Sequence, residues 1–354
     1  MAGRARGVDS QTWDQIADLA ISNNLGPALW LAIRGQSPKS QETTDRLRSA
    51  YHVNLGVMIR VRHQLHEALA VFHEYGVSPV PIKGALYLLD GTFADLGERM
   101  LSDIDVLVEP DAIEVAVTAL RSVGYTRVDK PFDRGHEVVM VHRRRPVPIE
   151  LHFELGDDSL TTVLGISEVL SGASPTSGDA ADEGWRTPSS THIALHHVLH
   201  AQVQDRSWRA FAVPLRQLQT FHAVVRRHGN DIDWLEVGAR LRYHGHGDAY
   251  ESYLRLARFF FDTPLPPSES LSVGGALDAG RLHDSIALAN LAIGNRPGNV
   301  YRNLSWALDG QYLRDRYSSS IVGDLPLAVL RAWHVAVLCR RGVPVFSDVT
   351  TDHW

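Results

Sequence analysis

The fold is decided by the stretch SDIDVLV, residues 102–108. Aspartate is depleted in β-strands, so two aspartates at alternate positions of an apolar strand need a reason. Alternate side chains share a face, which puts Asp103 and Asp105 about 6.6 Å apart along the strand, with Ile104 on the opposite, packed face. Two carboxylates at this spacing can hold a hard divalent cation such as Mg²⁺. The alternative is an exposed first turn of the strand with both aspartates solvated.

A tight turn precedes this strand. Residues 77–82 read as a strand, Lys83-Gly84-Ala85 as a turn, and residues 85–89 as the first turns of a helix. A glycine here lets backbone amides approach a phosphate, the helix N-terminus favours the phosphate charge, and Lys83 adds a cation. The turn is therefore a candidate phosphate site. The alternative is an ordinary strand-to-helix connection with an exposed lysine.

A second acidic strand is expected at residues 147–155, VPIELHFEL, where apolar residues alternate with Glu150, His152 and Glu154. If it pairs beside the first strand, Glu150 completes a three-carboxylate cluster able to hold two metal ions around a reacting phosphate. Glu150 is then either a metal ligand or a general base, and His152 either serves as the base or orients Glu150. The alternative is a half-exposed edge strand with a wet face.

Hydrophobic periodicity divides the chain into four parts. Residues 1–75 are expected to be helical, and residues 76–156 to form a small mixed α/β unit with one helix between Pro110 and Gly124. Residues 157–190, rich in Ser, Gly, Ala, Asp and Thr, are expected to be a flexible linker or loop. Residues 191–354 are expected to form a helical domain. The predicted fold class is therefore α+β, with helical regions on both sides of a small mixed sheet.

Composition narrows the setting and the partners. The net charge is −6 with scattered basic residues, which disfavours nucleic acid as a partner. No apolar run reaches about 18 residues, so no membrane span is expected. The single cysteine, Cys339, cannot form an internal disulfide and lies in an apolar helical run. A buried, inert thiol and a cytoplasmic location are expected.

In combination, residues 83–108, the helix after them and IELHFEL at 149–155 resemble the bacterial nucleotidyltransferases of the polymerase-beta-like superfamily, within a largely uncharacterised branch. The resemblance covers residues 76–155 well and residues 190–265 more loosely. It implies a minimal nucleotidyltransferase fold with Mg²⁺ ligands at Asp103, Asp105 and Glu150. Gly84 and Ser102 would lie near the triphosphate, and Lys83 and Arg99 would be phosphate contacts.

The implied reaction moves a nucleoside monophosphate from ATP or GTP, with two Mg²⁺ ions, onto a small-molecule, peptide or natural-product acceptor. The alternative is an inactive module that binds a nucleotide or a partner. Two departures bear on the acceptor and on the phosphate turn. The usual paired small residues appear as Gly84-Ala85, and residues 214–221, PLRQLQTF, offer glutamines where relatives often have an aspartate.

Other polar and aromatic clusters have structural alternatives. His192, His196 and His200 share a helix face that could bind zinc or border the active-site cleft, with a polar helix face as the simpler interpretation. The run of arginines at 143–145 is expected at a solvated hairpin tip. Three aromatic residues of the C-terminal region, Trp208, Phe211 and Phe221, are expected in the core.

Overall fold

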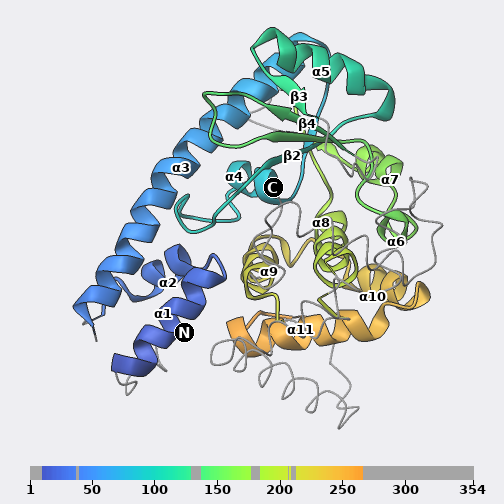
Figure 1. Ribbon diagram of the computed structural model, residues 1–354. Helices are drawn as coiled ribbons and strands as arrows, with labels where there is room; N and C mark the ends of the chain where they lie inside the picture. Colours follow the sequence, from blue (N-terminus) through green and yellow to red (C-terminus); the bar gives the residue numbers. More distant parts are fainter. Residues whose placement is uncertain are drawn as a thin grey trace, which may run out of the picture. The chain divides into compact units, whose positions relative to one another are not determined.

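A five-stranded mixed sheet lies at the centre of the described part of the chain (Figure 1). The strand order is β1 (Val80–Pro81), β2 (Ile104–Leu107), β5 (Ile149–His152), β4 (Glu137–Val141) and β3 (Thr126–Val128). Strands β2 and β5 are parallel, and every other pairing in this sheet is antiparallel. The two acidic strands are neighbours, which fulfils the condition for Glu150 to lie beside Asp105, and the α+β fold class is confirmed.

The computed structural model describes residues 10–36, 40–128, 137–176, 184–205, 207–208 and 213–265. Nearly all of them belong to one compact unit, formed by Met1–Lys130, His136–Asp205 and Pro214–Ser272. The expectations for Phe211, for Cys339 and for the part of the helical domain beyond residue 265 lie outside the described residues. Within the described residues, no helix is long and apolar enough to cross a membrane.

One face of the sheet packs against helices α3 (Gln41–Glu74) and α5 (Ile113–Ser122). Alternation puts Ile104, Val106 and Leu151 on this face, where they join the buried core. The buried side chains of α3, which include Leu65 and Phe72, pack into the same core. The opposite face of the sheet is therefore left for the polar side chains of β2 and β5.

The described residues of the N-terminal part are mostly helical. Helices α1 (Ser10–Ser22) and α2 (Gly26–Ile33) pack on α3, whose first turn is capped by the Ser40 hydroxyl accepting from Thr43 N. The helix α4 (Lys83–Leu89) follows β1, and η1 (Pro110–Ala112) precedes α5. At the β4–β5 hairpin tip Arg143 and Arg144 are exposed, while Arg145 reaches Glu67 on α3 at 2.6 Å.

The segment expected as a linker or loop contains packed structure in its first half. Helices α6 (Asp158–Thr161) and α7 (Ile166–Ser171) bury Leu160, Val169 and Leu170. Further on, β6 (Ser174–Pro175) pairs with β7 (Arg186–Thr187). A composition average hides such elements, because each is too short to show a period.

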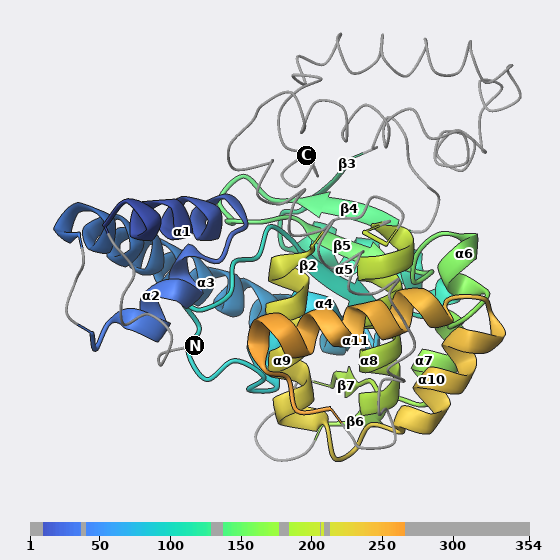
Figure 2. The ribbon, with the colours of Figure 1, turned by 90° about the horizontal axis from the view of Figure 1, so that it is seen from below.

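The C-terminal helices form a second buried cluster. These are α8 (Ser190–Leu199), the π-helical turn η3 (His200–Gln204), α9 (Leu215–His228), α10 (Trp234–Tyr243) and α11 (Gly247–Phe261), and α11 packs on α9 and α10 (Figure 2). Phe221 is fully buried and makes edge contacts with Trp234 and Tyr253, which confirms its core role. Trp208 is partly exposed.

Candidate active site

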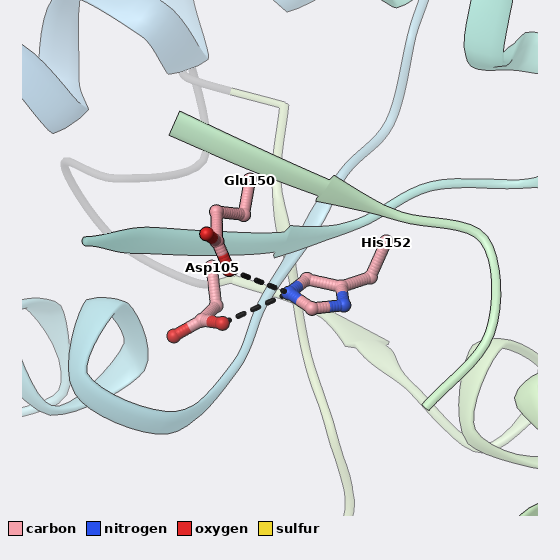
Figure 3. Close-up of side chains that lie close together, drawn as sticks. All are labelled: Asp105, Glu150 and His152. Atoms are coloured by element: carbon pink, nitrogen blue, oxygen red, sulfur yellow. Dashed lines mark hydrogen bonds and ion pairs between the residues drawn. The ribbon is translucent and has the colours of Figure 1, made fainter. Parts of the chain in front are cut away.

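Two carboxylates face each other across the parallel pair of strands. Asp105 on β2 and Glu150 on β5 are register partners, so their side chains share one face of the sheet. His152 lies two residues further along β5 and therefore on the same face (Figure 3). The alternation seen in the sequence thus produces one polar patch on a sheet whose other face is apolar.

Asp105 is the most constrained member of this patch. It is 3% exposed, and its Oδ1 lies 2.8 Å from Lys83 Nζ and 2.9 Å from His152 Nε2. Burial alone would raise the pKa of Asp105, but the Lys83 ammonium and the His152 contact outweigh it and lower the pKa. Asp105 is therefore ionised in the folded protein at neutral pH.

Lys83 and His152 respond to the same environment in opposite ways. Although burial opposes its charge, Asp105 and Asp103 raise the pKa of Lys83, so the ammonium form is held. Burial lowers the pKa of His152 despite the Asp105 contact. Lys83 also has a φ of +48°, a left-handed conformation that is strained for a residue with a side chain. That conformation lies at the start of α4, where the ammonium turns to Asp105.

A metal ion could be held by Asp105, Glu150 and His152, whose nearest ligand atoms all lie within 4.8 Å of one another. His152 Nε2 is 3.8 Å from Glu150 Oε2 and closer to Asp105 (Figure 3). The two carboxylates supply the oxygen ligands that Mg²⁺ prefers. Because His152 Nε2 is already in contact with Asp105 Oδ1, the imidazole fits the role of orienting that carboxylate better than that of a direct Mg²⁺ ligand.

Asp103 lies immediately before β2 and outside that group of three. Burial is the main reason that the pKa of Asp103 is raised, and the neighbouring Asp105 raises it further. The positive charges of Lys83, Arg99 and Arg216 lower the pKa in part. Asp103 is thus close enough to Asp105 for mutual repulsion. A cation between them would relieve it.

Gly84 is required by a close approach rather than by its backbone angles. A Cβ at this position would lie 1.9 Å from Leu101 Cδ2 and 2.5 Å from Arg99 Nη1. Any side chain at this position would therefore force the side chains of Leu101 and Arg99 to move. The local sequence pattern predicts a phosphate approach at this glycine, whereas its contact with Leu101 and Arg99 is a structural reason that the pattern does not reveal.

Arg99 is fixed by contacts on several sides. Its Nε donates to Thr220 Oγ1 at 3.3 Å, and its guanidinium lies 5.6 Å from the centre of the Tyr87 ring. Asn54 of α3 holds the main chain by donating to the carbonyl oxygen of Arg99 at 3.1 Å. Burial, with Arg216 nearby, lowers the pKa of Arg99 to about 10, so it stays charged at neutral pH. Ser102 is exposed and lies two residues before β2 begins.

The α8 histidines border the site instead of forming a separate cluster of metal ligands. His192 and His196 line a small cavity of about 10 Å³ together with Lys83 and Tyr87, enough space for about one water molecule. Burial lowers the pKa of His196, and His200 contacts Asp205 at 3.2 Å. Within the described ranges, only the Asp105 group has three such side chains close enough for a metal ion.

Two features of the site were not foreseen in the sequence. One is the direct contact of His152 with Asp105, since the sequence indicated only the shared face with Glu150. The other is Arg216, which influences both Arg99 and Asp103 from the first turn of α9. A basic residue in a helix carries no local sign of such a role.

A small mixed sheet with facing carboxylates on a parallel strand pair, closed by helices, is the arrangement expected of a nucleotidyltransferase core. The chain belongs to the family described as "Uncharacterised nucleotidyltransferase", whose model matches residues 9–262. No curated protein and no solved structure matches the chain significantly.

Proposed function

We propose that this protein transfers a nucleoside monophosphate from a nucleoside triphosphate, ATP or GTP, to a hydroxyl or phosphate group of an acceptor and releases pyrophosphate. The observation that carries the proposal is the register pairing of Asp105 with Glu150, with Asp103 two residues before Asp105. Together these carboxylates offer oxygen ligands for divalent ions, as in the two-metal sites used for in-line phosphoryl displacement. The proposal includes membership of the bacterial, polymerase-beta-like group of these enzymes.

In this proposal Asp103, Asp105 and Glu150 hold Mg²⁺, two ions when the site is full. The ions supply charge neutralisation at the attacking and leaving oxygens. The acceptor oxygen bonds to the α-phosphorus and gives up its proton to a base. The bond between the α-phosphorus and the bridging oxygen breaks, and its electron pair leaves with pyrophosphate. The chain itself contributes positioning and electrostatics and requires no covalent nucleophile.

The phosphate contacts in this proposal come from the turn before β2 and the loop leading into it. Lys83 and Arg99 supply cations, and Gly84 and Ser102 lie where the triphosphate would pass. Lys83 is in contact with Asp105 and 24% exposed, so it can also serve the phosphate side of the site only by sharing its ammonium protons. A fixed guanidinium such as Arg99 is suited to phosphate because its donors match two oxygens at once.

The acceptor belongs to the small-molecule, peptide or natural-product class in this proposal, and nucleic acid is disfavoured by the net charge of −6. A cytoplasmic location belongs to the same proposal. The competing hypothesis, an inactive binding module, lacks support from the site residues, because none of the three carboxylates is replaced.

The test is nucleotide binding by calorimetry for ATP, GTP, CTP and UTP, with Mg²⁺ and with chelator. Binding that needs Mg²⁺ is expected, and Asp105→Asn should abolish it. Mass spectrometry of candidate acceptors incubated with Mg²⁺ and the bound nucleotide should then show the added mass of one nucleoside monophosphate. Undiminished binding in chelator would sink the metal-dependent proposal.

A further inference from the structure

Helix α9 reaches the site through a short chain of contacts. Thr220 Oγ1 accepts a hydrogen bond from Arg99 Nε at 3.3 Å and donates one to the carbonyl oxygen of Arg216 at 3.0 Å. Residues four apart share a helix face, so Arg216 and Thr220 lie on the side of α9 that meets the Arg99 loop. Beside them Gln219 donates to Glu98 at 2.8 Å. The Arg99 loop is therefore held on this side by α9.

The same loop is held on its other side by α3. Asn54 donates to the carbonyl oxygens of Gly97 and Arg99, at 2.9 and 3.1 Å, and the Tyr51 hydroxyl contacts Asp95 at 3.0 Å. Arg99 is thus clamped between two helices that come from distant parts of the sequence. Its guanidinium keeps a fixed position next to the carboxylate strand.

Arg216 and Arg99 are two like charges that converge. Burial lowers the pKa of Arg99 most and Arg216 lowers it further, and both arginines partly offset the burial that raises the pKa of Asp103. Among the described residues, neither guanidinium forms an ion pair with a carboxylate, and Arg99 Nη1 is a buried donor without a hydrogen-bond partner. Two neighbouring cations without a direct ion pair to a carboxylate are costly to hold together, and an anion that binds between them would remove this cost.

We propose that Arg216 and Arg99 together bind the β- and γ-phosphates of the nucleotide, so that α9 supplies the binding site for the pyrophosphate that leaves. Guanidinium forks match phosphate oxygens in pairs, and two forks match a diphosphate. Arg99 and Arg216 act on Asp103, whereas His152 and Lys83 contact Asp105. The two arginines therefore lie on the Asp103 side of the site. The reacting phosphate lies at the carboxylates and the leaving group beyond Asp103.

This inference rests on the proposed function and gives α9 a role in it. As the bond to the α-phosphorus breaks, negative charge grows on the leaving pyrophosphate. Two fixed guanidiniums stabilise that charge without any rearrangement at the moment of reaction. Helix α9 would thereby belong to the substrate site and not only to the packing of the C-terminal helices.

The test uses inorganic pyrophosphate with Mg²⁺ as the probe, measured by calorimetry on the full chain. Arg216→Ala should weaken pyrophosphate and nucleoside triphosphate binding by about 10- to 100-fold, and Arg216→Lys less, because an ammonium lacks the fork. Mn²⁺ binding without any phosphate should change less than about twofold. Arg227→Ala, an exposed arginine of the same helix, is the matched control and should leave pyrophosphate binding unchanged.

The outcomes separate this inference from the function on which it rests. If the wild type binds nucleotide and pyrophosphate and Arg216→Ala binds both equally well, the role of Arg216 is overturned and the proposed function stands. If the wild type binds neither in the presence of Mg²⁺, both are overturned. Loss of Mn²⁺ binding with unchanged pyrophosphate binding would make Arg216 a counter-charge for Asp103 and would also refute the inference. Should Arg216→Ala unfold on a thermal melt, Arg216→Lys and Arg216→Gln are judged by the same criteria.

Discussion

His152 Nε2 lies 2.9 Å from Asp105 Oδ1, the same oxygen that Lys83 Nζ contacts at 2.8 Å. The hydrogen bonds and ion pairs that Asp105 makes with the described residues through its side chain therefore converge on one oxygen. They hold Oδ1 in place, and neither donor contacts Oδ2. In metal sites, residues that hydrogen-bond to a metal ligand orient it in this way.

Replacing His152 should consequently weaken metal binding without removing a ligand. His152→Phe keeps a ring of similar size in the buried position but cannot donate to Asp105. We expect the affinity for Mn²⁺ to fall by about 10- to 100-fold, measured by electron paramagnetic resonance of free Mn²⁺. His152→Gln, whose amide can donate, should recover part of the loss, and His63→Phe, with a side chain 69% exposed on α3, should have no effect. Wild-type affinity in His152→Phe would refute the orienting role.

The two aspartates of the β2 segment should differ in their effect on stability. The pKa of Asp105 is lowered in the folded protein, so its charge stabilises the fold, whereas the pKa of Asp103 is raised by burial and by Asp105. Asp105→Asn leaves the Lys83 ammonium without its partner and should cost roughly 3 kcal/mol. Asp103→Asn should leave stability unchanged or higher. Urea unfolding at pH 7 without divalent ions measures both, and the reverse order would contradict this account.

The sequence was sufficient to place Asp105 and Glu150 on the polar faces of two strands, but it left their pairing as a condition. Strand alternation gave each segment one polar and one apolar face, and the structure shows that the two strands are neighbours in one sheet. The resemblance added Arg99 and Ser102, which no periodicity marks. The positions were thus predictable because a strand has one repeating geometry.

The contacts made by helices of the C-terminal region were not predictable in the same way. Arg216 and Thr220 meet the Arg99 loop through packing between elements more than 100 residues apart, and local spacing says nothing about such a meeting. Gly84 is a similar case, since its contact with Leu101 depends on where the loop returns. These contacts are set by tertiary packing between distant segments and not by the local sequence.

Stability should also fall below neutral pH because of His197. Its Nε2 lies 2.8 Å from the carbonyl oxygen of Gln217, its ring stacks on Phe221, and burial lowers its pKa to about 3. An unfolded histidine titrates near 6.5, so the unfolded state binds more protons between about pH 3 and 6.5, and stability declines as the pH falls through that window. At pH 5.5 the resulting loss of folding stability is about 1.4 kcal/mol.

Thermal melts at pH 7.5 and 5.5 measure the effect. The loss of stability on acidification should be smaller in His197→Gln than in the wild type, since glutamine does not titrate. His52→Gln, an exposed histidine of α3, is the control and should behave like the wild type. An equal decline in His197→Gln would show that other groups are responsible.

The role of Glu150 can be decided by metal binding. Glu150 is the register partner of Asp105, with an Oε2 3.8 Å from His152 Nε2, and its side chain is 14% exposed. If Glu150 is a metal ligand, the Glu150→Gln variant should bind Mn²⁺ at least about tenfold more weakly. Its nucleotide binding should then recover at high metal concentration. As a general base, it should leave metal and nucleotide affinity intact while the transfer rate falls by about 10²- to 10⁴-fold.

We expect ligation, because a third carboxylate gives the site enough oxygen ligands to bind two divalent ions. The measurement is Mn²⁺ affinity together with nucleotide affinity across a Mg²⁺ titration, for the wild type and Glu150→Gln. Glu154→Gln, a partly buried acid just beyond the end of β5, is the matched control and should retain wild-type values. Unchanged Mn²⁺ and nucleotide affinity in Glu150→Gln, with transfer still lost at saturating Mg²⁺, would assign the residue as the base and remove it from the ligand set.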